Sequence, residues 1–226
     1  MSPTKKAAGI AGILTGVALL GEASFFMASG YMPDVWSDPT QAIAFIRDSE
    51  VMLRLAVLFG SLGVVARVLF VAGLAAAFKQ KARTAATAIL YFGVVGGIGH
   101  GLVALSYYLG IPSFLDLDAQ FASSAWGAFT AITGGFQGLG NFLLGLMLVA
   151  FGVATIKHKI MARGLGYVGL AVGMLTLFGV FAGGTPLQNA TFALFMPTIA
   201  LAMLFDVWAG VTLLKQAKRE VATTKL

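Results

Sequence analysis

The chain has 226 residues, of which 58% are hydrophobic and only 11% are charged. A soluble domain carries about 25% charged residues, so this composition excludes an ordinary soluble globular protein and indicates a surface that faces hydrocarbon. The formal net charge of +6 does not predict nucleic-acid binding, because the basic residues stand in loops beside apolar segments and are not interleaved with aromatic residues. The absence of cysteine excludes disulfides and thiolate metal sites.

Six apolar stretches follow one another along the chain, and each is long enough to cross about 30 Å of hydrocarbon as a helix. The first exceeds the apolar core of a cleaved signal peptide, so we interpret it as a first membrane span. The sequence therefore predicts an all-α bundle of six transmembrane helices in a single domain over residues 1–226. The expected spans are approximately 8–31, 51–78, 84–110, 124–156, 162–183 and 190–214.

Charges in the loops predict the orientation of this bundle. Twelve of the fifteen Lys and Arg residues lie before the first span, after the last, or in the second–third and fourth–fifth connections. Acidic residues dominate the opposite loops, where Arg47 is the one clear basic residue. By the positive-inside rule, both termini lie in the cytoplasm, and the protein is a multi-pass protein of the inner or plasma membrane.

The first outer loop, about 32–50, contains a helix signal of its own. Asp38 is expected to be the N-cap, Pro39 the first helical residue, and Gln41 the third position of a capping box. The apolar segment 42–46 then predicts a short amphipathic helix that lies on the membrane surface.

Four aromatic residues fall near the expected outer boundary of the membrane. Tyrosine and tryptophan gather at such interfaces because their rings are partly apolar and partly polar. The sequence therefore predicts interface anchors at Trp36, Tyr107, Tyr108 and Trp126.

Small residues recur four positions apart in several spans, which places them on one helix face and permits close approach of another backbone. This spacing predicts a compact bundle. A glycine face that is not used within the bundle would pack against a second copy of the chain or another membrane protein. The pairs are Gly12/Gly16, Gly93/Gly97/Gly101, Gly134/Gly138, Gly169/Gly173 and Gly179/Gly183.

Polar side chains interrupt the apolar spans at similar depth, and an ionisable group there costs several kcal/mol unless it is partnered or hydrated. At 1.5 Å per residue, most of them lie roughly 18–24 Å from the cytoplasmic boundary, and Asp206 lies at about 14 Å. Arg54 stands nearer the outer surface, within reach of the outer-loop acids. The candidate binding or ion-pair residues of this layer are Glu22, Arg67, His100, Gln137, Asn141 and Asp206.

Three interpretations of this layer remain open. It binds a small apolar or amphipathic ligand or passes a proton, for which His100 is a suitable carrier. Alternatively, Arg67 pairs with Glu22 or Asp206, and the layer only braces a non-catalytic membrane subunit or scaffold. The third interpretation is an intramembrane enzyme. The serines near the outer boundary would be its nucleophiles, but they lack a clear base to activate them. We expect no catalytic residues and no cofactor or metal, because a single histidine within the spans cannot supply a bis-histidine haem site.

Four segments carry a family resemblance: DPTQAIAFIR at 38–47, VMLRLAV at 51–57, GNFLLGLM at 140–147 and RGLGYVG at 163–169. Their order resembles that in a family of bacterial and archaeal six-span membrane proteins classed as a domain of unknown function. In that family an outer-loop helix leads into a span with an arginine near its start. The resemblance implies the fold and topology and no activity.

Overall fold

A computed structural model of the chain describes residues 3–30, 38–115, 117, 119–183 and 185–224. These residues form seven α-helices, and no strand occurs among them. Six of the helices are long and apolar enough to cross a membrane. The predicted all-α fold with six spans is therefore confirmed.

The helices extend past several of the apolar stretches that predicted them. Charged and amide residues such as Lys, Arg and Gln are good helix formers, so hydropathy locates the membrane-crossing part of a helix and not its ends. The six long helices and the short α2 are α1 (Pro3–Ala28), α2 (Pro39–Asp48), α3 (Glu50–Phe78), α4 (Arg83–Leu115), α5 (Ala119–His158), α6 (Arg163–Ala182) and α7 (Gln188–Thr224).

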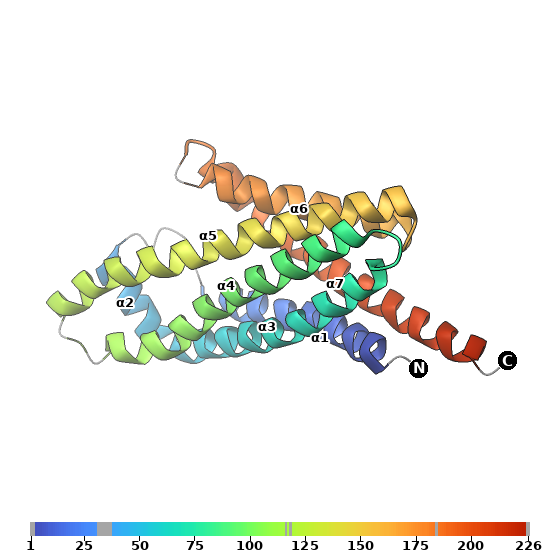
Figure 1. Cartoon of the computed structure of the whole chain (residues 1–226). Helices are drawn as coiled ribbons and strands as arrows, with labels where there is room; N and C mark the ends of the chain where they lie inside the picture. The colour runs from blue at the N-terminus through green and yellow to red at the C-terminus, as the bar shows by residue number, and fades with distance from the viewer. Residues whose placement is uncertain (1–2, 31–37, 116, 118, 184, 225–226) are drawn as a thin grey trace.

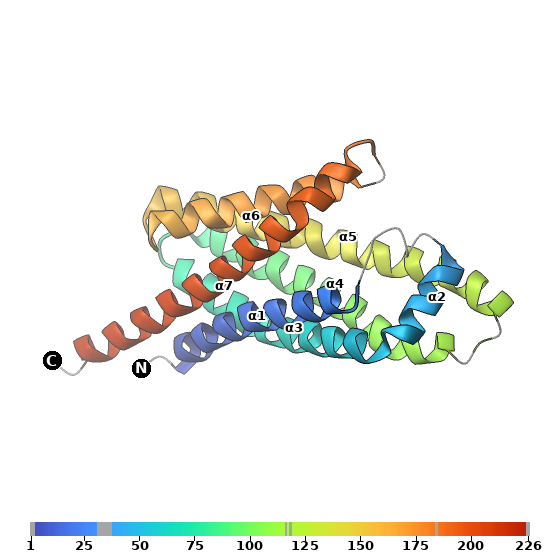
Figure 2. The same ribbon diagram turned by 180° about the vertical axis from the view of Figure 1, so that it is seen from behind.

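Both ends of the described chain and the turns at 79–82 and 159–162 lie at one end of the bundle (Figure 1). Figure 2 shows the same arrangement from behind, with α2 at the opposite end. We call these the basic end and the α2 end. An ion pair between Lys5 and Glu220 joins α1 to α7 at the basic end. The described basic residues at or near this end are Lys5, Lys6, Lys79, Lys81, Arg83, Lys157, Lys159, Arg163, Lys215, Lys218 and Arg219.

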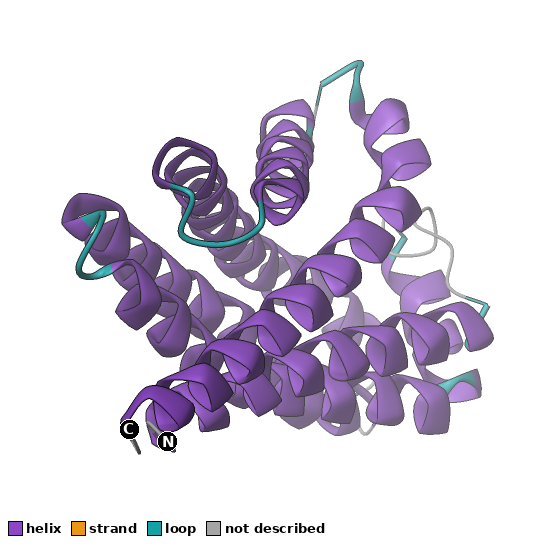
Figure 3. Cartoon of the chain, turned by 90° about the vertical axis from the view of Figure 1, so that its right-hand side faces the viewer, coloured by secondary structure: helices purple, strands orange, loops and turns teal. Residues whose placement is uncertain are grey.

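The six long helices contact one another in a closed ring, seen from the basic end in Figure 3. The order of neighbours is α7, α1, α3, α4, α5 and α6, and α6 in turn contacts α7. The half of the ring nearer the basic end is filled by one buried core cluster to which all six contribute.

Phenylalanine rings from three helices meet in the centre of this core. Phe151 of α5 lies 5.2 Å from Phe78 of α3 and 4.9 Å from Phe205 of α7, measured between ring centroids. Phe205 also lies 6.4 Å from Phe70. We call Phe70, Phe78, Phe151 and Phe205 the aromatic plug, because burial of these rings fills the middle of the bundle on its basic side.

Helix α2 begins as its capping signal predicts. The Asp38 carboxylate accepts hydrogen bonds from the backbone N–H groups of Thr40 and Gln41, at 2.8 and 3.2 Å. The expectation that its apolar face lies on the membrane surface is wrong in part, because Ala42 and Ile46 are fully buried. They belong to a small core cluster with Leu53 of α3 and Trp126 of α5, so α2 covers the end of the bundle.

The structure describes the side chains of two of the four predicted aromatic anchors. Trp126 is 1% exposed and packs inside the cluster beneath α2, so its role as an interface anchor is wrong. Tyr107 packs edge-to-face on Phe129, with 5.1 Å between ring centroids. Trp36 and the Tyr108 side chain lie outside the described residues.

Glycines allow α1 and α7 to cross with their backbones in contact. A β-carbon at Gly210 of α7 would stand 2.7 Å from the Gly9 carbonyl oxygen and 2.9 Å from the Ile13 nitrogen of α1. Gly16 faces α7 in the same crossing, and Gly12 faces both Gly210 of α7 and the Phe70 ring of α3. The predicted close packing of Gly12/Gly16 is thus confirmed.

Other predicted glycine pairs differ in what they face. Gly173 of α6 lies against the backbone of α5, as predicted. In contrast, a β-carbon at Gly134, Gly138 or Gly179 would meet none of the described residues within 4 Å, so these glycines pack against no other helix in the described part of the chain.

Replacing Gly210 by Ala should destabilise the protein by roughly 1–3 kcal/mol, because the added methyl group meets backbone atoms that cannot move aside. Gly134→Ala is the matched control, since it adds the same methyl group within a helix where nothing lies within 4 Å. That control should be neutral or stabilising by about 0.5–1 kcal/mol, through helix propensity alone. Chemical unfolding in detergent micelles measures both, and equal effects would contradict the crossing.

Candidate functional site

An ion pair links α3 to α7 inside the membrane-spanning part of the bundle. Nη2 of Arg67 lies 3.5 Å from Oδ2 of Asp206. The Asp206 side chain is only 8% exposed and that of Arg67 is 21% exposed, so water screens this pair little. Gly16 of α1 lies beside Asp206, its β-carbon position 3.6 Å from the Asp206 β-carbon, so the glycine crossing determines where this carboxylate stands.

Glu22 of α1 approaches the same guanidinium from a different side. Its carboxylate lies over Gly60 of α3, where a β-carbon would stand 2.9 Å from Oε1. Gly60 and Arg67 are seven residues apart and share one face of α3, and Glu22 interacts electrostatically with Arg67. No hydrogen bond or ion pair of the described residues holds the Glu22 carboxylate, so the one guanidinium faces two acids and is bonded to one.

His100 and Asn141 form a neutral pair between α4 and α5. The two atoms His100 Nε2 and Asn141 Oδ1 are 2.7 Å apart, and with the amide in this orientation the imidazole N–H donates. The helices can approach this closely because Gly96 and Gly99 face Gly140 across the contact. Arg67 also acts electrostatically on His100, so this pair borders the charged group.

The structure thus brings five of the predicted residues to one region, which we call the polar cluster: Glu22, Arg67, His100, Asn141 and Asp206. They come from five of the six ring helices, α1, α3, α4, α5 and α7. The cluster adjoins the aromatic plug, since Asp206 follows Phe205 and Arg67 precedes Phe70 by one helical turn. The buried core fills the bundle on its basic side, and the cluster stands where that core ends.

Two predicted residues lie outside this arrangement. The Gln137 side chain is exposed on α5, and none of the hydrogen bonds among the described residues includes it. Arg54 pairs with Glu50 one turn away on α3, at 2.5 Å, and is 45% exposed. This agrees with the expectation that Arg54 would meet an acid at the outer surface.

Sequence reasoning missed Gly60 and the aromatic plug. Gly60 could have been found from its spacing, because it stands two turns from Arg67 on the same helix face. The plug could not, because phenylalanines are spread over every span.

The two hollows described on the surface lie away from the polar cluster. One is lined by α4 residues at the basic end and the other by α3 residues around Arg54. Among the described residues, no three His, Asp or Glu side chains gather closely enough to hold a metal ion.

Six apolar helices with a polar cluster between them define an integral membrane protein of the polytopic α-helical class. The chain belongs to the family described as "Domain of unknown function (DUF4386)", whose model matches residues 10–215. This bears out the resemblance drawn from the four sequence segments. Comparisons with curated proteins and with solved structures each gave no match.

Replacing Arg67 by Met should destabilise the protein by roughly 3–5 kcal/mol, because it leaves the buried Asp206 carboxylate without its cation. The double variant Arg67→Met/Asp206→Leu should recover most of this loss, since it removes both charges. Arg54→Met is the control, because it breaks an exposed pair that contributes less than about 1 kcal/mol. Unfolding in detergent micelles, followed by helical circular dichroism, measures all three. An Arg67→Met effect no larger than that of Arg54→Met would contradict a buried pair.

Proposed function

We propose that the polar cluster binds and releases a proton, as the binding step of a transport-type membrane protein. The observation that carries this proposal is the ratio of one guanidinium to two carboxylates. Arg67 is bonded to Asp206 at 3.5 Å, and Glu22 has only an electrostatic interaction with it.

Charge balance in hydrocarbon supports a proton as the ligand. With all three groups ionised, the cluster would carry one excess negative charge, which costs several kcal/mol within a bilayer. A proton bound to either acid restores neutrality. In this geometry Arg67 pairs with Asp206 and acts on Glu22 only electrostatically. A move of its guanidinium from Asp206 to Glu22 would therefore change which acid holds the proton.

The position of the cluster also supports this proposal. The aromatic plug and the buried core cluster fill the bundle toward the basic end. Glu22, His100 and Asn141 are all only part-buried, and their positions along the helices lie on the α2 side of the plug. Proton exchange would therefore occur with the α2 side, until a rearrangement of α7 and its Phe205 opened the other side.

A second candidate function is a non-catalytic membrane subunit, and one observation favours it. The Arg67–Asp206 and His100–Asn141 pairs each satisfy two polar side chains across two helices, as a brace would. Glu22 distinguishes the two functions, because a purely structural network of paired side chains provides no partner for its carboxylate.

Infrared spectroscopy of the protein in liposomes tests the proton directly. The native chain should show a carboxylic-acid carbonyl band that grows as the pH is lowered, and Glu22→Gln should remove or shift it, since the proton sits on or exchanges with Glu22. Glu50→Gln is the matched control, because that acid lies in an exposed ion pair at the α2 end. If Glu22→Gln and Glu50→Gln gave the same spectrum as the native chain, the cluster would not bind a proton and the brace would stand.

We also propose that the chain lies in the inner or plasma membrane, with its basic end in the cytoplasm. The observation in support is that most of the described basic residues gather at this end, with Glu220 as the acid beside them, whereas Arg47 and Arg54 lie at the α2 end. Positive charge of this kind is retained on the cytoplasmic side during insertion.

Because the chain has no cysteine, a single introduced thiol reports orientation without background. Thr84→Cys at the basic end should react with a membrane-impermeant maleimide only after the cells are opened, whereas Thr40→Cys on α2 should react in intact cells. Both positions are exposed, so accessibility is matched. The reverse pattern would invert the proposed topology.

A further inference from the structure

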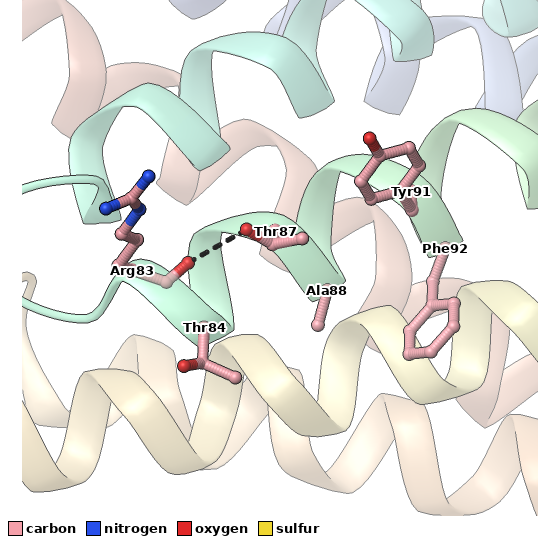
Figure 4. Close-up of a pocket in the computed structure, with 6 residues that line it drawn as sticks. All are labelled: Arg83, Thr84, Thr87, Ala88, Tyr91 and Phe92. Carbon is pink, nitrogen blue, oxygen red and sulfur yellow. Dashed lines mark hydrogen bonds between the residues drawn. The ribbon is translucent and has the colours of Figure 1, made fainter.

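The surface of α4 nearest the basic end is hollowed over about 500 Å³ (Figure 4). Small side chains cause the hollow, because Thr84, Thr87 and Ala88 stand between the bulkier Arg83 and the two rings at Tyr91 and Phe92. The Thr87 hydroxyl donates to the Arg83 carbonyl oxygen at 3.1 Å, so its one donor is used within the helix.

The charge at the mouth of this hollow is uncompensated. Arg83 is exposed and takes part in none of the ion pairs of the described residues. Lys79 and Lys81 in the preceding turn are exposed as well. The sequence contains no Asp or Glu between residues 51 and 115, so the α3–α4 hairpin has no acid near these cations, its Glu50 lying at the α2 end.

The hollow also changes character along its length. Arg83 is the first residue of α4, whereas Tyr91 lies eight residues on, roughly 12 Å deeper into the membrane. The Tyr91 ring is 64% exposed and faces hydrocarbon, and Ala88 and Phe92 add to the apolar wall. A cation at the membrane surface is thus continuous with an apolar trough at acyl-chain depth.

We propose that this hollow is a binding site for an anionic phospholipid, with its phosphate at Arg83 and an acyl chain along Ala88 and Tyr91. A guanidinium binds phosphate oxygens through two parallel N–H donors, and basic groups at this position in a membrane attract anionic headgroups. The charge on the protein selects an anionic lipid over a zwitterionic one, and the apolar wall selects a lipid over a free phosphate. This site is independent of the proton-binding cluster and makes no use of it.

Native mass spectrometry of the full chain in detergent, titrated with phosphatidylglycerol or with phosphatidylcholine of the same acyl chains, tests the site. The native chain should retain one phosphatidylglycerol more tightly than phosphatidylcholine. Arg83→Gln should weaken that retention about fivefold or more. Arg163→Gln is the matched control, because Arg163 is the exposed first residue of α6 at the same end and does not line the hollow.

Two further measurements keep the proposal open to failure. Tyr91→Ala should also weaken phosphatidylglycerol binding, and because the ring is exposed, the fold should survive the change. Glycerol phosphate, which has the headgroup charge and no chains, should not displace the lipid. Equal losses in Arg83→Gln and Arg163→Gln, equal retention of both lipids, or displacement by glycerol phosphate would each overturn the site. A partner protein bound stoichiometrically to the native chain, with no lipid retained, would also overturn the site.

Discussion

A charge inside a bilayer is costly unless another group compensates it, and the guanidinium of Arg67 is the charge around which this bundle is arranged. Asp206 is bonded to it, and Glu22 and His100 interact with it electrostatically. These residues come from α7, α1 and α4, which are joined through α3. The ring of helices therefore has a polar hub on α3, and a displacement of α7 would change the pairing of Asp206 with Arg67.

Glycines allow the helices to approach closely enough for these polar side chains to meet. Each polar contact lies beside a place where two helices touch: Gly16 near Asp206, Gly60 beneath Glu22, and Gly140 beside the His100–Asn141 pair. Helices in lipid lack a hydrophobic drive to associate and rely on close packing and hydrogen bonds. In this protein the small residues and the polar residues act together, since the former bring the backbones close enough for the latter to reach.

The two ends of the bundle differ in how much of the ring is filled by buried side chains. Toward the basic end the plug and the large core cluster fill the ring. Toward the α2 end a smaller cluster joins α2 to α3 and α5, and Phe26 of α1 and Tyr107 of α4 pack against it. Glu22 lies on the less filled side of the cluster, and none of the hydrogen bonds or ion pairs of the described residues includes its carboxylate. The proposed proton site rests on this asymmetry, because a purely structural ion-pair network needs no acid beyond the one that neutralises its cation.

The sequence by itself determined the six spans, the alternation of their connections and the α2 cap, because apolar length, loop charge and capping residues act locally. It also identified the polar residues, since a charge in an apolar span stands out whatever its neighbours are. Only the tertiary structure decided which of them meet. Gln137 and Asn141 are one turn apart on α5 with similar sequence signals, yet one is exposed and the other bonds His100. The same holds for glycines, because Gly210 meets a backbone and Gly134 meets nothing. Helix spacing fixes which residues share a face, but the rotation and crossing of whole helices fix what that face touches, and these depend on all six helices packing at once.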